Sequence, residues 1–205
     1  MEDFDLIINN FNEPTSVLDL GCGHFEMLVK FLDCRTVARL VGVDDDRDGH
    51  ILTMCNCPTL DELSRNIERY IYSCLFAMDL EDKANLAKLS FIPISINDYL
   101  ESVNEVFNII ILSNVYHYYA DGRERIQLLK SIKTKLSKDG ILLIRVAGEG
   151  HSVYREAESV KVVFSSSRLL VEARCAGLNA ATKVYSRNNN TNLSVVFRKA
   201  VTDVS

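Results

Sequence analysis

The chain has 205 residues, of which 47% are hydrophobic and 25% are charged, and its formal net charge is −5 at pH 7. These values are typical of a soluble globular domain, and the acidic balance argues against a non-specific nucleic-acid binder. No apolar run approaches the ~20 residues that cross a bilayer, and the N-terminal segment opens with acidic residues where a signal peptide carries basic ones. We therefore expect one cytoplasmic domain over residues 1–205, with no membrane partner.

The six cysteines predict reduced thiols rather than a disulfide framework. Only Cys55 and Cys57 are close together in the sequence, and no second pair of Cys or His has the spacing of zinc ligands. We therefore assign no metal.

Residues 17–20 and 40–43 are apolar at nearly every position, as are 107–112 and 141–146 further along the chain. Such runs are typical of parallel strands covered on both faces, because an antiparallel strand with one wet face alternates apolar and polar residues. Between the first two runs, residues 24–34 carry apolar side chains at helical spacing and predict a helix. The order strand, helix, strand indicates a layered α/β fold.

The stretch between the second and third apolar runs is longer than one crossover helix and one strand require, and it predicts a helical insertion at about 45–88. Thr59 precedes acidic residues and a repeat of apolar positions, which predicts a helix N-cap and a long helix to about residue 77. A short helix and then a strand over 89–96 are expected to follow.

A further helix is predicted over 123–136, and another over 167–176 with Gly177 as its left-handed cap. The strand-like runs 181–186 and 193–198 are joined by an Asn-rich turn and predict a hairpin. The sheet is therefore expected to be mostly parallel with an antiparallel end.

Two polar regions lie outside the predicted core, namely one face of helix 123–136 and the loop 148–167. The basic residues of helix 123–136, Arg123 and Arg125 among them, are interpreted as a solvated face. The loop over 148–167 follows a strand at the carboxyl end of the sheet, where ligands of open α/β sheets bind. Three residues of this loop are therefore candidates for substrate contact: His151, Tyr154 and Arg155.

The segment from Val17 to Phe25 carries the strongest functional signal. A buried strand ends at Asp19-Leu20, and a turn containing Gly21 and Gly23 leads into a helix, so a ligand can approach the backbone closely. Asp44 ends the second strand, where a carboxylate is placed to accept hydrogen bonds from both hydroxyls of a ribose. Together, the turn and the acid predict a site for a cofactor that carries a nucleoside.

The details of the turn favour S-adenosylmethionine over a dinucleotide. A dinucleotide fold usually shows GxGxxG, and here Glu26 stands where the third glycine would fall and would repel a pyrophosphate. Asp19 suits the ammonium group of an amino-acid cofactor. A nicotinamide-dependent dehydrogenase is therefore a weaker alternative.

These motifs resemble those of the class I S-adenosylmethionine-dependent methyltransferases. Residues 17–25 resemble the family's first motif. Asp44 resembles the acid that the family has after its second strand, and Asn97-Asp98 resembles the acid after its third strand. Its fourth-strand motif resembles 107–117, and its fifth strand and preceding turn resemble 136–144. The resemblance covers most of the chain in the family's order.

The resemblance implies an α/β fold with a doubly wound, mostly parallel seven-stranded sheet in the order 3-2-1-4-5-7-6, its last strand antiparallel and helices on both faces. It also implies a set of cofactor-binding residues: Asp19, Gly21, Cys22, Gly23, Asp44, Asp45, Asn97, Asp98, Ser113 and Asn114. The chain departs from the family's pattern at Phe25, where a third glycine is common, and at Asn108, where an Asp is common.

On the acceptor side, His117 follows the fourth strand and is by analogy the best placed general base, with local packing as the alternative. Tyr116 is the second candidate catalytic residue, while Tyr118 and Tyr119 either wall an acceptor pocket or pack against the next helix. We expect methyl transfer to a small molecule. A non-catalytic methyltransferase-like binding or regulatory module is the alternative, and an RNA or protein methyltransferase is a further one.

Overall fold

The computed structural model describes residues 14–32, 34–76, 86–149, 161–187 and 192–200. The chain divides into two compact units, residues 1–99 and residues 100–205, and each is described by itself. Over the described residues, no helix is both long enough and apolar enough to cross a membrane.

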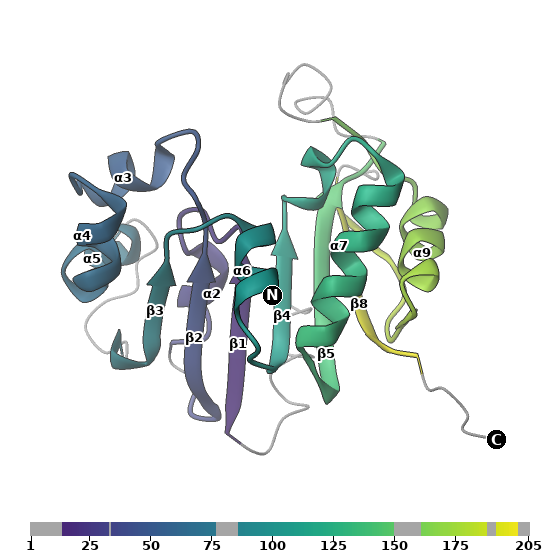
Figure 1. The fold of residues 1–205 in the computed structure, drawn as a ribbon, viewed down its shortest axis with the longest axis horizontal. Coiled ribbons are helices and arrows are strands. Elements are labelled where there is room, and N and C mark those ends of the chain that lie inside the picture. The colour runs from purple at the N-terminus through teal and green to yellow at the C-terminus, as the bar shows by residue number, and fades with distance from the viewer. Residues whose placement is uncertain (1–13, 33, 77–85, 150–160, 188–191, 201–205) are drawn as a thin grey trace. The chain divides into compact units, whose positions relative to one another are not determined.

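The first unit contains three parallel strands in the order β3-β2-β1 (Figure 1). Their bounds are Thr15–Leu20 for β1, Val37–Val43 for β2 and Leu89–Ile92 for β3. Gly42 of β2 stands opposite Asp19 of β1 and opposite Phe91 of β3. The apolar side chains of β1 and β2 are almost wholly buried, as their continuous apolar pattern predicts.

Short helices accompany these strands. Their bounds are Glu26–Val29 for α2, His50–Cys55 for α3, Leu60–Arg65 for α4, Ile67–Phe76 for α5 and Leu86–Lys88 for the 3₁₀ turn η1. Helices α3, α4 and α5 are grouped beside β3 in Figure 1. Helix α6, Ile96–Ser102, runs across the boundary between the units.

The second unit pairs β4 with β5 in parallel, and β8 then pairs with β5 and β6 in antiparallel. A short additional strand, β7, also pairs with β8. The bounds are Phe107–Ser113 for β4, Leu136–Ala147 for β5, Leu178–Ala180 for β6, Tyr185–Arg187 for β7 and Asn192–Lys199 for β8. The predicted orders 3-2-1 and 4-5-7-6 are confirmed within their units, with β8 in the seventh-strand position.

Two helices and one 3₁₀ turn complete the described part of the second unit. They are η2, Tyr116–Tyr118; α7, Gly122–Lys135; and α9, Ser166–Cys175. Asp121 and Ser165 cap α7 and α9 by accepting backbone N–H groups. Gly177 has φ 78°, which confirms the left-handed residue predicted after α9.

The helix predicted over 24–34 is much shorter in the structure. Only α2 is helical, because Phe25 adopts a left-handed conformation with φ 60° and the chain turns again after Val29. The apolar residues that suggested a longer helix, Phe31 and Leu32, are still buried. Helical spacing of apolar residues therefore identified the buried face and overestimated the length of the helix.

The long helix predicted from Thr59 to about residue 77 is broken. Thr59 is the N-cap as predicted, since its Oγ1 accepts the N–H of Glu62 at 3.1 Å. The helix stops at Asn66, which leaves the helical conformation with φ −129° and donates its side-chain amide to Glu62. This single non-helical residue separates α4 from α5.

Two strand predictions also need correction. The strand predicted over 89–96 ends at Ile92, because Pro93 lacks an N–H and Ser95 then caps α6 by accepting the N–H of Asp98. The strand predicted over 181–186 is replaced by β6 and β7 on either side of an irregular stretch.

The cap at Thr59 gives a first test of this fold. Thr59→Ala removes the acceptor of the Glu62 N–H, so we expect the free energy of unfolding to fall by about 1 kcal/mol in urea titrations followed by circular dichroism. Thr134→Ala is the matched control, because that hydroxyl is exposed and bonds only to a carbonyl within its own helix. Equal stability of the Thr59 variant and the wild type would contradict the assigned cap.

Candidate functional site

The glycine-rich turn between β1 and α2 is fixed to the end of β2. The N–H groups of Gly21 and Cys22 both donate to the carbonyl of Val43, at 2.8 and 3.2 Å. Gly21 and Gly23 have φ values of 74° and 47°, which favour glycine at both positions. The turn therefore lies against the carboxyl end of the second strand.

Close packing of Cys22 on β2 depends on Gly42. A Cβ added at Gly42 would lie 2.8 Å from Cys22 Sγ and 3.0 Å from Leu28 Cδ1, so no larger residue fits without displacing the turn. Burial raises the pKa of the Cys22 thiol well above its ordinary value, and the nearby charges of Asp19 and Asp44 raise it further. Cys22 is thus a packing residue of the turn and no nucleophile.

Asp44 joins the turn to the loop that follows β2. Its Oδ2 accepts the N–H of Gly23 at 3.0 Å, and its Oδ1 accepts the N–H of Asp46 at 2.7 Å. Loss of solvent around the carboxyl raises the pKa of Asp44, and these two backbone hydrogen bonds oppose the shift. The carboxylate is therefore held in one orientation by two backbone donors.

The surroundings of Asp44 fit a ribose. Each carboxylate oxygen can accept more than one hydrogen bond, so Asp44 keeps acceptor capacity for two hydroxyls. A Cβ built on Gly23 would meet no heavy atom within 4 Å, which leaves open space beside the N–H that bonds to Asp44. The chain thus places a fixed carboxylate next to an open stretch of backbone, as the predicted nucleoside cofactor requires.

Asp46 supports Asp44 and was not singled out by sequence analysis. Its carboxylate accepts the N–H groups of Ile51 and Leu52 at 2.8 and 3.1 Å and so satisfies the first turn of α3. These two bonds fix the loop in which the Asp46 N–H donates to Asp44. Asp45 instead pairs with Arg47 at the surface, Nε to Oδ2 2.6 Å.

Two other residues of the first motif are buried. Asp19 is 1% exposed, and its charge acts on the Cys22 thiol, so the carboxylate lies close to the turn. The Phe25 ring is fully buried and packs edge-to-face on Phe91, with ring centroids 5.4 Å apart. The departure from glycine at Phe25 is therefore accommodated by the core of the first unit.

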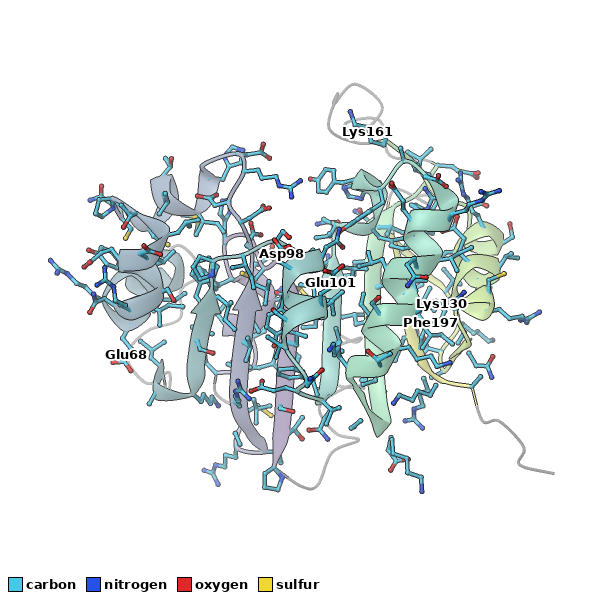
Figure 2. All side chains as sticks on the ribbon, viewed as in Figure 1. Glu68, Asp98, Glu101, Lys130, Lys161 and Phe197 are labelled. Atoms are coloured by element: carbon cyan, nitrogen blue, oxygen red, sulfur yellow. The ribbon has the colours of Figure 1, made fainter. Side chains whose placement is uncertain are left out.

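Asn97 and Asp98 lie on a helix rather than in a loop after a strand. Both belong to the first turn of α6, and Figure 2 shows Asp98 on this helix. The Asp98 carboxylate accepts the hydroxyl of Ser95 at 2.6 Å, and the Ser95 hydroxyl accepts the Asp98 N–H at 3.2 Å. This reciprocal pair is a helix capping arrangement.

In the second unit, β4 ends at Ser113, and Asn114 follows in a left-handed conformation with φ 59°. The Asn114 N–H donates to the carbonyl of Arg145 at 2.9 Å, which fixes the turn to β5. Asn tolerates this conformation better than most residues, so its presence here has a local structural reason. Ser113 and Asn114 belong to a different unit from the Asp44 cluster.

The three residues of η2 differ sharply in exposure. Tyr116 and His117 are fully buried, whereas Tyr118 is 46% exposed. His117 Nδ1 accepts the N–H of Ala147 at 3.5 Å, an arrangement in which neutral histidine carries its proton on Nε2. The Tyr118 ring lies edge-on to His117, with ring centroids 4.5 Å apart.

A buried ion pair lies beside η2. Arg125 of α7 is fully buried and binds Glu172 of α9 through two hydrogen bonds, Nε to Oε2 at 2.9 Å and Nη2 to Oε1 at 2.6 Å. The Tyr116 hydroxyl also donates to Glu172 Oε2, at 2.8 Å. The solvated face predicted for helix 123–136 is therefore wrong at Arg125 and at Lys135, which is also buried, although Lys130 is exposed (Figure 2).

This arrangement changes the chemistry of its members. Desolvation raises the pKa of Tyr116 above its ordinary value, and its bond to Glu172 raises it further. The Tyr116 hydroxyl is thus a committed donor to Glu172. Desolvation also raises the pKa of Glu172, but the hydrogen bonds from Arg125 and Tyr116 outweigh it and lower the pKa overall.

Some candidates fall outside the described part of the chain, namely His151, Tyr154 and Arg155. Among the described residues, no group of three or more His, Cys, Asp and Glu side chains has the geometry of a metal site.

The comparisons with known proteins identify the family. The model of a methyltransferase domain family matches residues 3–196, so the chain belongs to that family. The resemblance found in the sequence is therefore confirmed. No curated protein matches the chain.

Many solved structures share the fold. A methyltransferase from Clostridium acetobutylicum that depends on S-adenosylmethionine is 11% identical, with a TM-score of 0.64 over 98% of this chain and 89% of that one. The 1,6-didemethyltoxoflavin-N1-methyltransferase of Burkholderia thailandensis, solved with its substrate and S-adenosylhomocysteine, is 17% identical, with a TM-score of 0.65 over 96% and 76%. These likenesses confirm the predicted fold class.

A third neighbour is longer than this chain. The mitomycin 7-O-methyltransferase is 14% identical, with a TM-score of 0.61 over 91% of this chain, which spans about half of that protein (49%).

The buried pair gives a pH prediction. The pKa of Glu172 is lowered by folding, so its stabilising contribution is present above the ordinary value of 4.5 and is lost as the pH falls through the folded-state value. We expect Glu172→Gln to cost roughly 3 kcal/mol at neutral pH, because it leaves Arg125 buried without its anion. The difference from the wild type should shrink as the pH falls below 4.5.

Urea unfolding at a series of pH values measures this difference. Glu124→Gln, an exposed position on α7, the helix of Arg125, is the control and should stay within about 0.5 kcal/mol of the wild type throughout. A constant difference for Glu172→Gln across the pH range would show that its charge is not what stabilises the fold.

Proposed function

We propose that the protein is an S-adenosylmethionine-dependent methyltransferase that acts on a small-molecule acceptor. The observation that carries the proposal is the Asp44 carboxylate, held by Gly23 and Asp46 beside the open backbone of the glycine turn. Membership of the methyltransferase family supports the reaction class. Two solved neighbours, the toxoflavin-precursor and mitomycin enzymes, support a small acceptor, because their names describe methylation of small molecules.

On this proposal, the first unit supplies cofactor contacts from the turn and from the loop after β2. Asp44 accepts the ribose hydroxyls, Asp19 faces the amino-acid part, and the backbone of Gly21, Cys22 and Gly23 allows close approach. Further contacts from the first unit come from Asp45, Asn97 and Asp98, whereas Ser113 and Asn114 rest on the family resemblance alone. When bound, S-adenosylmethionine supplies a methyl group on a positively charged sulfur.

The second unit supplies the acceptor side through His117 and its neighbours. With Nδ1 accepting from Ala147, a neutral His117 carries its proton on Nε2. Removing a proton from the acceptor would require the other tautomer of His117. Tyr116, committed to Glu172, acts by holding the segment rather than by moving a proton.

We also propose a single domain over residues 1–205, since one family model spans both compact units, with the helices between β2 and β3 as its insertion at 45–88. A cytoplasmic location is part of the proposal and is supported by the reduced thiols that the cysteine spacing predicts.

A non-catalytic binding module is the second candidate, and one observation favours it. Tyr116 and His117 are fully buried, so neither proposed catalytic side chain is exposed to an acceptor. Binding of the cofactor without turnover would distinguish this module from an enzyme. Methylation of an RNA or a protein in place of small molecules is the remaining alternative.

Ligand binding tests the cofactor site. We expect S-adenosylhomocysteine at a hundred times its dissociation constant to stabilise the wild type by about 2.7 kcal/mol in thermal unfolding, and NAD to have no effect. Asp44→Asn should weaken this binding by about 10- to 100-fold, because hydrogen bonds to a charged group contribute roughly 1.5–3 kcal/mol.

The matched control is Asp48→Asn, an exposed acid in the same loop, which should bind like the wild type. No stabilisation of the wild type by S-adenosylhomocysteine, or stabilisation by NAD instead, would overturn the proposed cofactor.

Turnover tests the acceptor side. The wild type, given S-adenosylmethionine and the small-molecule fraction of a cell extract, should form S-adenosylhomocysteine. We expect His117→Asn to lower that rate by about 10²- to 10⁴-fold while S-adenosylhomocysteine binds as before. An unchanged rate would assign His117 to packing, and a wild type that binds without turnover would favour the binding module.

A further inference from the structure

The segment from Tyr116 to Ala120, here called the η2 segment, is held at three points by two side chains. Arg125 Nη1 donates to the carbonyl of Tyr119 at 2.7 Å and to that of Ala120 at 2.8 Å. Glu172 accepts the hydroxyl of Tyr116 at 2.8 Å. Both ends of the segment are thereby attached to the same ion pair, which itself joins α7 to α9.

The geometry of Arg125 makes this attachment rigid. Its planar guanidinium uses Nε and Nη2 for Glu172 and Nη1 for the two carbonyls, so each of its three nitrogens has a fixed acceptor. Phe164 stacks on Tyr116 with ring centroids 5.2 Å apart, and the Arg125 guanidinium lies 5.4 Å from the Phe164 centroid. A rotation of Arg125 would therefore break several contacts at once.

Stability alone is a poor explanation for such an arrangement. Two buried charges lose their hydration, and apolar residues of similar volume often stabilise a core as well or better. Apolar residues would, however, leave the carbonyls of Tyr119 and Ala120 without these donors. The specific contribution of the pair is therefore the orientation of the η2 segment.

The oriented segment carries the residues of the proposed acceptor side. His117 is buried in its middle, and its carbonyl accepts the N–H groups of Lys161 and Val162 at 3.1 and 3.2 Å. Tyr118, the most exposed side chain of η2, lies edge-on to the His117 ring. The placement of both rings follows from the backbone that Arg125 and Glu172 hold.

We propose that Arg125 and Glu172 are positioning residues for methyl transfer, which fix the η2 segment and thereby hold the His117 ring and the exposed Tyr118 ring of the acceptor side in one geometry. This inference rests on the proposed function for its catalytic meaning. Both residues bind the η2 segment and neither is a proposed cofactor contact, so their loss should lower turnover and leave cofactor affinity unchanged.

The test separates orientation from stability with a double variant. Arg125→Met should lower the thermal midpoint and raise amide hydrogen exchange in residues 116–121 by about tenfold or more, because the segment opens locally. Arg125→Met combined with Glu172→Leu removes both charges and should recover most of the midpoint. In that double variant the exchange of residues 116–121 should stay raised, since the carbonyls of Tyr119 and Ala120 still lack the donor that Arg125 supplied.

The matched control is Arg123→Met, at an exposed position on the same helix, which should leave both the midpoint and the exchange unchanged. A double variant in which exchange returns to the wild-type level together with the midpoint would overturn the inference. So would wild-type exchange in Arg125→Met.

Turnover links the segment to the reaction. With the small-molecule fraction of a cell extract, the double variant should form S-adenosylhomocysteine at least about tenfold more slowly than the wild type. Its dissociation constant for S-adenosylhomocysteine should stay within about twofold. Equal turnover despite raised exchange would overturn the positioning role. A wild type that fails to bind S-adenosylhomocysteine would instead refute the proposed function, whereas the exchange result decides whether the pair orients the segment.

Discussion

The candidate cofactor site depends on one carboxylate that accepts two backbone N–H groups. Asp44 takes one from Gly23 in the turn after β1 and one from Asp46 in its own loop. These two bonds fix the orientation of a charge that burial disfavours, as the raised pKa of Asp44 shows. The turn, the loop and the start of α3 thereby form one structure, because Asp46 in turn satisfies the N-terminus of that helix.

In the second unit, charged side chains also bind backbone groups, but there the groups are carbonyls and the main donor is an arginine. The carbonyls of Tyr119 and Ala120, after β4, lie outside regular helices and strands, so they need side-chain hydrogen-bond donors. Arg125 supplies these donors from α7, and Glu172 neutralises it from α9. In both units, ionised side chains with little solvent around them therefore bind backbone groups that lie outside regular helices and strands.

Much of this architecture was predictable from sequence because it depends on local chemistry. The continuous apolar runs identified the parallel strands, Thr59 and Gly177 marked helix ends, and the acid after β2 identified the candidate site. The break at Asn66 was missed because a helical pattern of apolar residues continues through it. Apolar periodicity reports which side of a segment is buried, and it is insensitive to a single residue that leaves the helix.

The features that sequence reasoning missed depend on distant partners. Arg125 shares α7 with other basic residues, and nothing in the neighbouring sequence distinguishes it from the exposed Lys130. Its burial follows from Glu172, far along the chain. The supporting role of Asp46 likewise depends on where α3 begins. The run of three acids, Asp44-Asp45-Asp46, was the available signal, since like charges are seldom adjacent without separate partners to hold them.

The contact between Cys22 and Gly42 has a consequence for how this sequence can vary. Cys22 Sγ occupies the volume that a side chain on Gly42 would need, so the two positions share a single space. A relative with alanine in place of Gly42 should also carry a smaller residue in place of Cys22, because alanine at Gly42 alone would collide with the Cys22 side chain and push the turn away from β2. We therefore expect the two positions to vary together, although one lies in a turn and the other in a strand.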